Sequence, residues 1–146
     1  MLILADTGIL LRLFDPKEPL RPAIESQVLD HESGGDEIAT SHQNHIEFWN
    51  VCTRPATSRG GYGLSLGETD RRLSKVESAI FTLSEHSATR GYWRQLVVQH
   101  SVRGKQVHDA RLVALMMAHG VTHIMTLNAA DFARYPQITV IDPSAP

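Results

Sequence analysis

Four carboxylates in this 146-residue chain are spaced so that they could act together on one substrate. They are Asp6, Glu47, Asp109 and Asp131. Each lies just beyond a predicted strand or in the first turns of a predicted helix. Carboxylates that gather at one place raise one another's pKa, and a hard divalent cation such as Mg²⁺ or Mn²⁺ relieves that repulsion. Such a centre suits phosphodiester hydrolysis, because the cation lowers the pKa of a bound water and neutralises charge on the phosphate.

The elements that must position these acids alternate along the chain. Short apolar runs predict strands at 2–5, 37–40, 124–127 and 137–141. Helical spacing of apolar residues predicts helices at 9–14, 23–32, 43–53, 66–81, 88–100 and 107–118. This alternation predicts an α/β fold whose parallel sheet is covered on both faces. Right-handed crossovers place the strand exits along one edge of such a sheet, where ligands bind in open parallel sheets.

Taken one at a time, the acids also have a simpler interpretation as helix caps. Asp6 or Thr7 could cap the helix that begins near Gly8, and Asp109 lies where a helix dipole favours an anion. The functional interpretation depends on the joint placement of the four acids at strand exits.

Composition limits the class of protein. The length predicts a single domain, 1–146, and the contents of 42% hydrophobic and 21% charged residues are those of an ordinary globular protein. The single cysteine, Cys52, favours a reducing compartment, and no signal peptide or membrane-spanning run is evident, so we expect a cytoplasmic location and no membrane contact. The eight histidines lack metal-ligand spacing. A net charge of −2 means that any RNA partner must meet clustered arginines and lysines or bound metal ions.

A glycine-rich connection at 55–67 is the long loop of the chain. Ordered loops of this length are commonly functional or mobile. Arg54 and Arg59 flank it and are candidate contacts to an RNA backbone, and Tyr62 could stack on a base. The simpler interpretation of all three is that they are solvated surface side chains.

The chain resembles the PIN domains, and especially the VapC-like ribonuclease toxins of bacterial toxin–antitoxin modules. No single motif is specific, but together they occur in the family's order over nearly the whole chain. The matching segments are Leu4-Ala5-Asp6-Thr7, Glu47-Phe48-Trp49 with Thr53-Arg54-Pro55, His108-Asp109-Ala110, and Thr126-Leu127-Asn128 with Asp131-Phe132.

The resemblance implies a three-layer α/β/α sandwich around a mostly parallel sheet of four to five strands. It also implies RNA cleavage that depends on Mg²⁺ or Mn²⁺, a homodimer, and a cognate antitoxin protein that inserts near the acidic groove. The metal-ligand roles would fall on Asp6, Glu47, Asp109 and Asp131, with Thr7, Thr126 and Asn128 as supporting polar residues. Gly8 departs from the family, which commonly has a polar residue at this position.

Two other functions compete with the ribonuclease. Asp6-Thr7-Gly8 also spells the aspartic protease motif, but that enzyme needs an all-β barrel and a second copy of the loop. A non-catalytic RNA- or protein-binding module on the same fold is the other alternative, since fold alone does not fix function. Such a module has little reason to keep four convergent acids.

Overall fold

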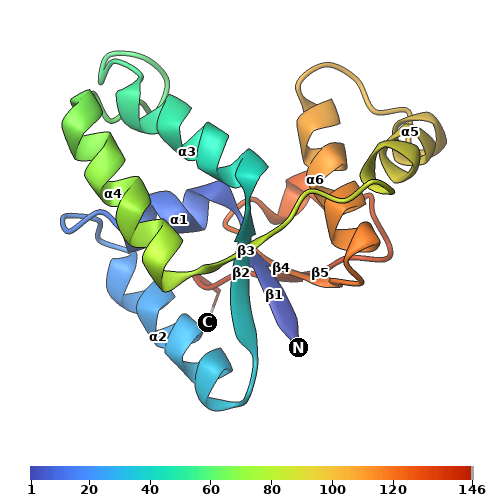
Figure 1. Ribbon diagram of the computed structural model, residues 1–146, viewed down its shortest axis with the longest axis horizontal. Helices are drawn as coiled ribbons and strands as arrows, with labels where there is room; N and C mark the ends of the chain where they lie inside the picture. The colour runs from blue at the N-terminus through green and yellow to red at the C-terminus, as the bar shows by residue number, and fades with distance from the viewer. Residues whose placement is uncertain (146) are drawn as a thin grey trace.

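A computed structural model describes residues 1–145, which form five strands and six α-helices in alternation (Figure 1). The strands are β1 (Leu2–Ala5), β2 (Glu37–Ser41), β3 (Phe81–Leu83), β4 (His123–Met125) and β5 (Thr139–Ile141). The helices are α1 (Thr7–Leu13), α2 (Arg21–Ser33), α3 (His42–Thr53), α4 (Leu66–Ala79), α5 (Thr89–Gln99) and α6 (Gln106–Ala118), with a short 3₁₀ turn, η1, at Ala129–Asp131.

All five strands pair in parallel, in the order β3-β2-β1-β4-β5. The predicted α/β class is confirmed, and an aspartic protease barrel is incompatible with this helix-covered sheet. The sequence prediction missed β3, because the helical pattern was continued through Phe81. In the structure α4 ends at Ala79 and Ile80 is already extended, with φ of −127° and ψ of 129°.

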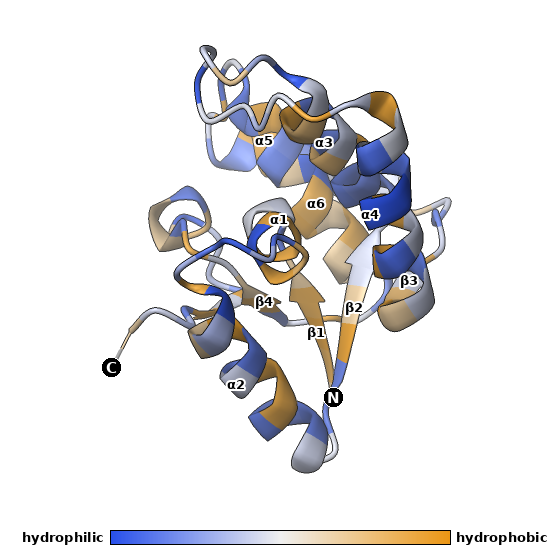
Figure 2. Cartoon of the chain, turned by 90° about the vertical axis from the view of Figure 1, so that its left-hand side faces the viewer, coloured by the Kyte–Doolittle hydropathy of each residue, from blue (hydrophilic) through white to orange (hydrophobic). Residues whose placement is uncertain are grey.

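The strands are apolar on both faces, as expected for a sheet buried between helices. On β1, Leu4 packs into one core cluster with residues of α5 and α6, while Ile3 and Ala5 pack into a second cluster with α1 to α4. Figure 2 shows β1 hydrophobic along its length. The chain is therefore a three-layer α/β/α sandwich, as predicted.

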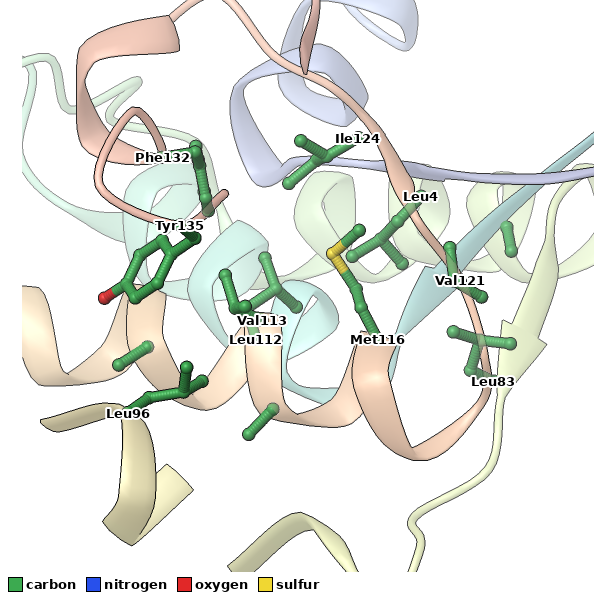
Figure 3. Packing of buried hydrophobic residues seen from close by; sticks show 13 residues of the cluster. Leu4, Leu83, Leu96, Leu112, Val113, Met116, Val121, Ile124, Phe132 and Tyr135 are labelled. Atoms are coloured by element: carbon green, nitrogen blue, oxygen red, sulfur yellow. The ribbon is translucent and has the colours of Figure 1, made fainter. Parts of the chain in front are cut away.

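Helix α6 closes the first of these clusters. It buries five consecutive residues, Leu112 to Met116, so the helix is apolar on nearly every side after its first turn. Figure 3 shows Leu112, Val113 and Met116 of this helix among the other side chains of the cluster. The buried stretch fixes the first turn of α6, which carries Asp109, relative to the sheet. No helix within residues 1–145 has the length and apolar character needed to cross a membrane.

Candidate active site

The strand order reverses beside β1. From β1 the chain builds β2 and β3 on one side, and it then crosses to β4 and β5 on the other. In open parallel sheets, ligands bind beyond the carboxyl ends of the strands at such a switch point. Asp6 directly follows β1 and Thr126 directly follows β4, so both lie at this point.

The carboxylate of Asp6 is held by groups that follow β1 and β4. Its Oδ1 accepts a hydrogen bond from the backbone N–H of Thr7 at 2.8 Å, and its Oδ2 accepts one from Thr126 Oγ1 at 2.8 Å. The Thr126 hydroxyl in turn accepts from the backbone N–H of Asn128 at 3.1 Å. Asp6 also caps α1, so its functional and capping interpretations are compatible.

A buried chain of hydrogen bonds orients Glu47 on α3. Ser41 Oγ donates to Asn44 Oδ1 at 2.6 Å, and Asn44 Nδ2 donates to Thr7 Oγ1 at 3.0 Å. Thr7 Oγ1 then donates to Glu47 Oε2 at 2.7 Å. Ser41 and Asn44 are fully buried. Neutral side chains in the core thus hold a carboxylate that points out of it. We call this hydrogen-bonded series, which runs through Ser41, Asn44, Thr7 and Glu47, the Ser41–Glu47 relay.

Gln43 joins α3 to α6 across the site. Its Nε2 donates to Glu47 Oε1 at 3.0 Å and to the carbonyl of His108 at 2.7 Å. Its Oε1 accepts from Arg111 Nη1 at 3.0 Å, and Arg111 Nη2 donates to Glu85 Oε2 at 3.0 Å. Both oxygens of Glu47 are therefore engaged, one by the relay and one by Gln43.

The four acids act on one another electrostatically. Burial raises the pKa of Asp109 to about 7, and the negative charges of Asp131, Asp6 and Glu47 add to the rise against a weaker opposing effect of Arg134. Burial also raises the pKa of Asp6, while its bonds to Thr126 and Thr7 oppose the rise and the charges of Glu47 and Asp131 add to it. The four carboxylates are therefore near enough for the other three to raise the pKa of Asp109, and their role in a metal site stays a prediction.

A groove of about 650 Å³ opens over this cluster. Helix α3 lines it with Glu47 and the exposed Ile46, and the start of α6 lines it with Asp109. Asp131, on η1, also lines the groove and is exposed. Volumes of about 300–1,000 Å³ are typical of ligand clefts. We call this cavity the acidic groove.

The donor set fits a hard divalent cation that keeps much of its water. Within residues 1–145, no set of three or more histidine, cysteine, aspartate and glutamate side chains is arranged to surround one ion. Mg²⁺, however, is commonly bound by one or two carboxylates and completes its shell with waters. Burial, with the charges of the neighbouring acids, raises the pKa of Asp6 and of Asp109, and a bound cation would stabilise their ionised forms.

Sequence reasoning missed Asn44, Gln43 and Arg111. Asn44 and Gln43 bond to residues that lie between 37 and 68 positions away along the chain. No local motif marks such contacts. The position of Asn44 one turn before Glu47 on the predicted helix was the one available signal.

The predicted RNA-binding loop is a folded extension of α3. The backbone N–H groups of Tyr62, Gly63 and Leu64 donate to the carbonyls of Val51, Arg54 and Cys52, at 3.0, 2.8 and 2.8 Å. These bonds satisfy carbonyls at the end of the helix, which otherwise lack partners. Tyr62 packs against the second core cluster, which leaves it poorly placed to stack on a base.

The two arginines of this loop do not line the acidic groove. Arg54 Nη1 donates to the carbonyl of Arg59 at 2.7 Å, so its guanidinium braces the loop. Arg59 is exposed. Their contact with RNA stays a prediction.

Gly61 is required where the loop crosses the end of α3. A Cβ at this position would lie 2.3 Å from the Pro55 carbonyl oxygen and 2.7 Å from that of Arg54. We expect Gly61→Ala to lower the free energy of unfolding by roughly 1–3 kcal/mol, as overpacked sites do. Gly91→Ala on α5 is the control, because its Cβ would meet open space, and it should raise stability by about 0.5–1 kcal/mol. Urea denaturation measures both, and equal changes in the two variants would contradict the packing argument.

No protein-family model and no curated protein sequence matches the chain. Solved structures do match in fold. VapBC2 from Rickettsia felis, solved bound to a promoter DNA fragment, aligns with a TM-score of 0.71 at 16% identity, over 97% of this chain and 98% of that one. VapBC-1 from nontypeable Haemophilus influenzae aligns with a TM-score of 0.70 at 14% identity, over 99% and 100% of the two chains.

The chain shares the α/β fold of these solved structures, in agreement with the fold that the resemblance implied. Other solved structures of this fold are described as a toxin or as a toxin–antitoxin complex. They include VapC20 of Mycobacterium tuberculosis, a sarcin-ricin loop cleaving toxin, with a TM-score of 0.58 at 14% identity over 84% of this chain and 86% of that one.

Proposed function

We propose that this protein is a metal-dependent endoribonuclease, and that it is the toxin of a toxin–antitoxin pair. The observation that carries the proposal is the convergence of four mutually repelling carboxylates at the switch point of a PIN-fold sheet. A module that only binds RNA or protein gains nothing from that repulsion. A nuclease gains a place for Mg²⁺ or Mn²⁺ beside a phosphodiester.

In this proposal the cation lies among Asp6, Glu47, Asp109 and Asp131, bound directly by one or two of these carboxylates and to the others through its waters. A bound Mg²⁺ or Mn²⁺ would supply Lewis acidity and a water of lowered pKa. The supporting residues orient the carboxylates of Asp6 and Glu47, and the bonds to Asp6 oppose the rise of its pKa. Thr126 and the backbone of Thr7 donate to Asp6, and Asn128 fixes the hydroxyl of Thr126. Hydrogen bonds that orient ligating groups commonly contribute about 10–100-fold to metal affinity or activity.

The structural neighbours also support a protein partner. Several of them were solved as toxin–antitoxin complexes, among them a complex from Klebsiella pneumoniae that aligns over 97% of this chain at 19% identity and a TM-score of 0.66. We propose a cognate antitoxin for this chain by the same reasoning, and a homodimer as its solution state.

The proposal is tested by RNA cleavage. Purified protein should cleave a structured RNA when Mg²⁺ or Mn²⁺ is present and should stop when EDTA is added. Asp109→Asn should lower the cleavage rate by more than about 100-fold, beyond the range of outer-shell substitutions. The carboxylate of Asp109 makes no hydrogen bond to any of residues 1–145, so the variant should stay folded.

Asp70→Asn, at an exposed position on α4, is the matched control and should keep full activity. Full cleavage activity in Asp109→Asn would contradict the proposed metal-binding role of the four acids. A protein that binds RNA but never cleaves it, with any of the metals, would favour the non-catalytic binding module.

A further inference from the structure

A second hollow of about 380 Å³ adjoins the acidic groove. The two cavities share Glu85 and Arg111 in their walls. Beyond this pair the second hollow is lined by His86, Arg90 and Trp93, from α5 and the segment before it. We call it the arginine hollow. Because it shares a wall with the groove, a ligand lying over the acids could continue past Arg111 into it.

Arg111 stands at the junction with one side of its guanidinium fixed. Nη1 donates to Gln43, which is bonded to Glu47, so the position of this arginine is tied to that of the acid cluster. Nη2 donates to Glu85, whose side chain is 52% exposed. An ion pair as exposed as this contributes about 0–1 kcal/mol, so a phosphate can displace the Glu85 carboxylate at little cost.

Arg90 and Trp93 give the arginine hollow a stacking surface. The Arg90 guanidinium lies 5.8 Å from the centre of the Trp93 ring. The indole is held by its Nε1, which donates to the carbonyl of Val107 at 2.9 Å. Unpaired RNA bases stack on aromatic rings and on arginine planes. A fixed indole with an exposed arginine over it suits this kind of contact.

Charge differs between the two cavities. The acidic groove carries four carboxylates, those of Glu47, Glu85, Asp109 and Asp131, against Lys105 and Arg111. The arginine hollow carries two arginines against the single carboxylate of Glu85. A phosphate over the acids needs a cation, whereas its neighbour along the strand would meet guanidinium groups directly.

We propose that the arginine hollow binds the nucleotide next to the cleaved phosphodiester, with Arg111 on its phosphate and Arg90 and Trp93 on its base. Glu85 occupies the phosphate position on Arg111 until RNA displaces it. The proposal rests on the ribonuclease function, because it extends the path of the substrate from the acid cluster.

The test is RNA binding in an Asp109→Asn background with Mn²⁺ present. The probe is a short fluorescein-labelled single-stranded RNA of mixed sequence, followed by anisotropy at several salt concentrations. Arg111→Ala and Arg90→Ala should each weaken binding several-fold. Arg111→Ala should also lower the slope of log affinity against log salt by about 0.7, the value for one phosphate contact to a single strand. Glu85→Gln should tighten binding, since it removes the competing carboxylate.

The chain offers matched controls for each change. Arg94 is exposed on α5, one turn beyond Arg90, and does not line the arginine hollow. Arg71 and Glu68 form an ion pair on α4 that lies outside both cavities, with Arg71 exposed and Glu68 half-buried. Arg94→Ala, Arg71→Ala and Glu68→Gln should leave the affinity and the salt slope unchanged.

The outcomes separate this inference from the ribonuclease function. If RNA binds and each hollow variant binds as tightly as its control, the proposed role of the arginine hollow is wrong and the ribonuclease function is unaffected. The comparisons are Arg111→Ala with Arg71→Ala, and Arg90→Ala with Arg94→Ala. An absence of RNA binding in every variant overturns both. Weaker binding in the two hollow variants alone, with tighter binding in Glu85→Gln, supports the proposal.

Discussion

Asn44→Ala is expected to lower the free energy of unfolding by about 2–4 kcal/mol and the affinity for Mn²⁺ by about 10–100-fold. Asn44 is fully buried in the centre of the Ser41–Glu47 relay. Its loss leaves the hydroxyl of Ser41 without its acceptor and the hydroxyl of Thr7 without a donor. Each buried polar group left without a hydrogen-bond partner lowers the free energy of unfolding by roughly 1–3 kcal/mol. The released Thr7 hydroxyl can then rotate away from Glu47, so the damage extends to the acid cluster.

Urea denaturation and calorimetric titration with Mn²⁺ measure the two effects separately. The matched control is Asn50→Ala, because Asn50 is exposed on the same helix. It should change stability by less than about 0.5 kcal/mol. If Asn44→Ala weakened the fold but bound Mn²⁺ as tightly as wild type, the relay would be structural only.

Asp109→Asn is expected to stabilise the metal-free protein, and to do so more strongly as the pH rises. The pKa of Asp109 is about 7 in the folded protein and near 3.8 when the chain is unfolded. Below about pH 4 the carboxyl group is protonated in both states and has no effect. Between about pH 4 and 7 the unfolded state loses the proton first, so folding becomes progressively less favourable. Above pH 7 the full penalty is present, and asparagine never carries it.

Thermal melts in EDTA from pH 4.5 to 8.5 should show this widening gap between Asp109→Asn and wild type. Adding Mn²⁺ at pH 7.5 should narrow or reverse the gap. A ligand that binds only the folded state stabilises by about 2.7 kcal/mol at a hundredfold excess over its Kd, and the variant has lost a ligand. Asp70→Asn should follow wild type at every pH. A gap that stays constant with pH would show that the pKa of Asp109 is not raised in the folded protein.

The acids and the sheet could be predicted because both have local signals. Apolar runs marked β1, β2, β4 and β5, and the alternation with helices predicted that the sheet is parallel, although it did not give the order of the strands. β3 has only three residues and lies at the edge of the sheet, with Phe81 exposed and Leu83 buried. So short a segment shows no periodicity that separates it from the end of α4.

The contacts around the acids could not be predicted, since they join residues far apart in the sequence. Gln43 bonds across 65 residues to His108, and Arg111 across 26 residues to Glu85. The packing of the loop at 55–67 could not be predicted for a related reason. Its glycines suggested mobility, whereas one of them permits a close crossing with the end of α3.

The hydrogen bond between Thr126 and Asp6 spans 120 residues. β1 is the central strand, and its second neighbour, β4, is made from nearly the last part of the chain. Chains fold from the N-terminus as they are synthesised, at about 5–20 residues per second. A growing chain on the ribosome therefore carries Asp6 for most of its synthesis beside an open sheet edge. The four acids can meet only after β4 has emerged and paired, so the site is completed among the last steps of synthesis.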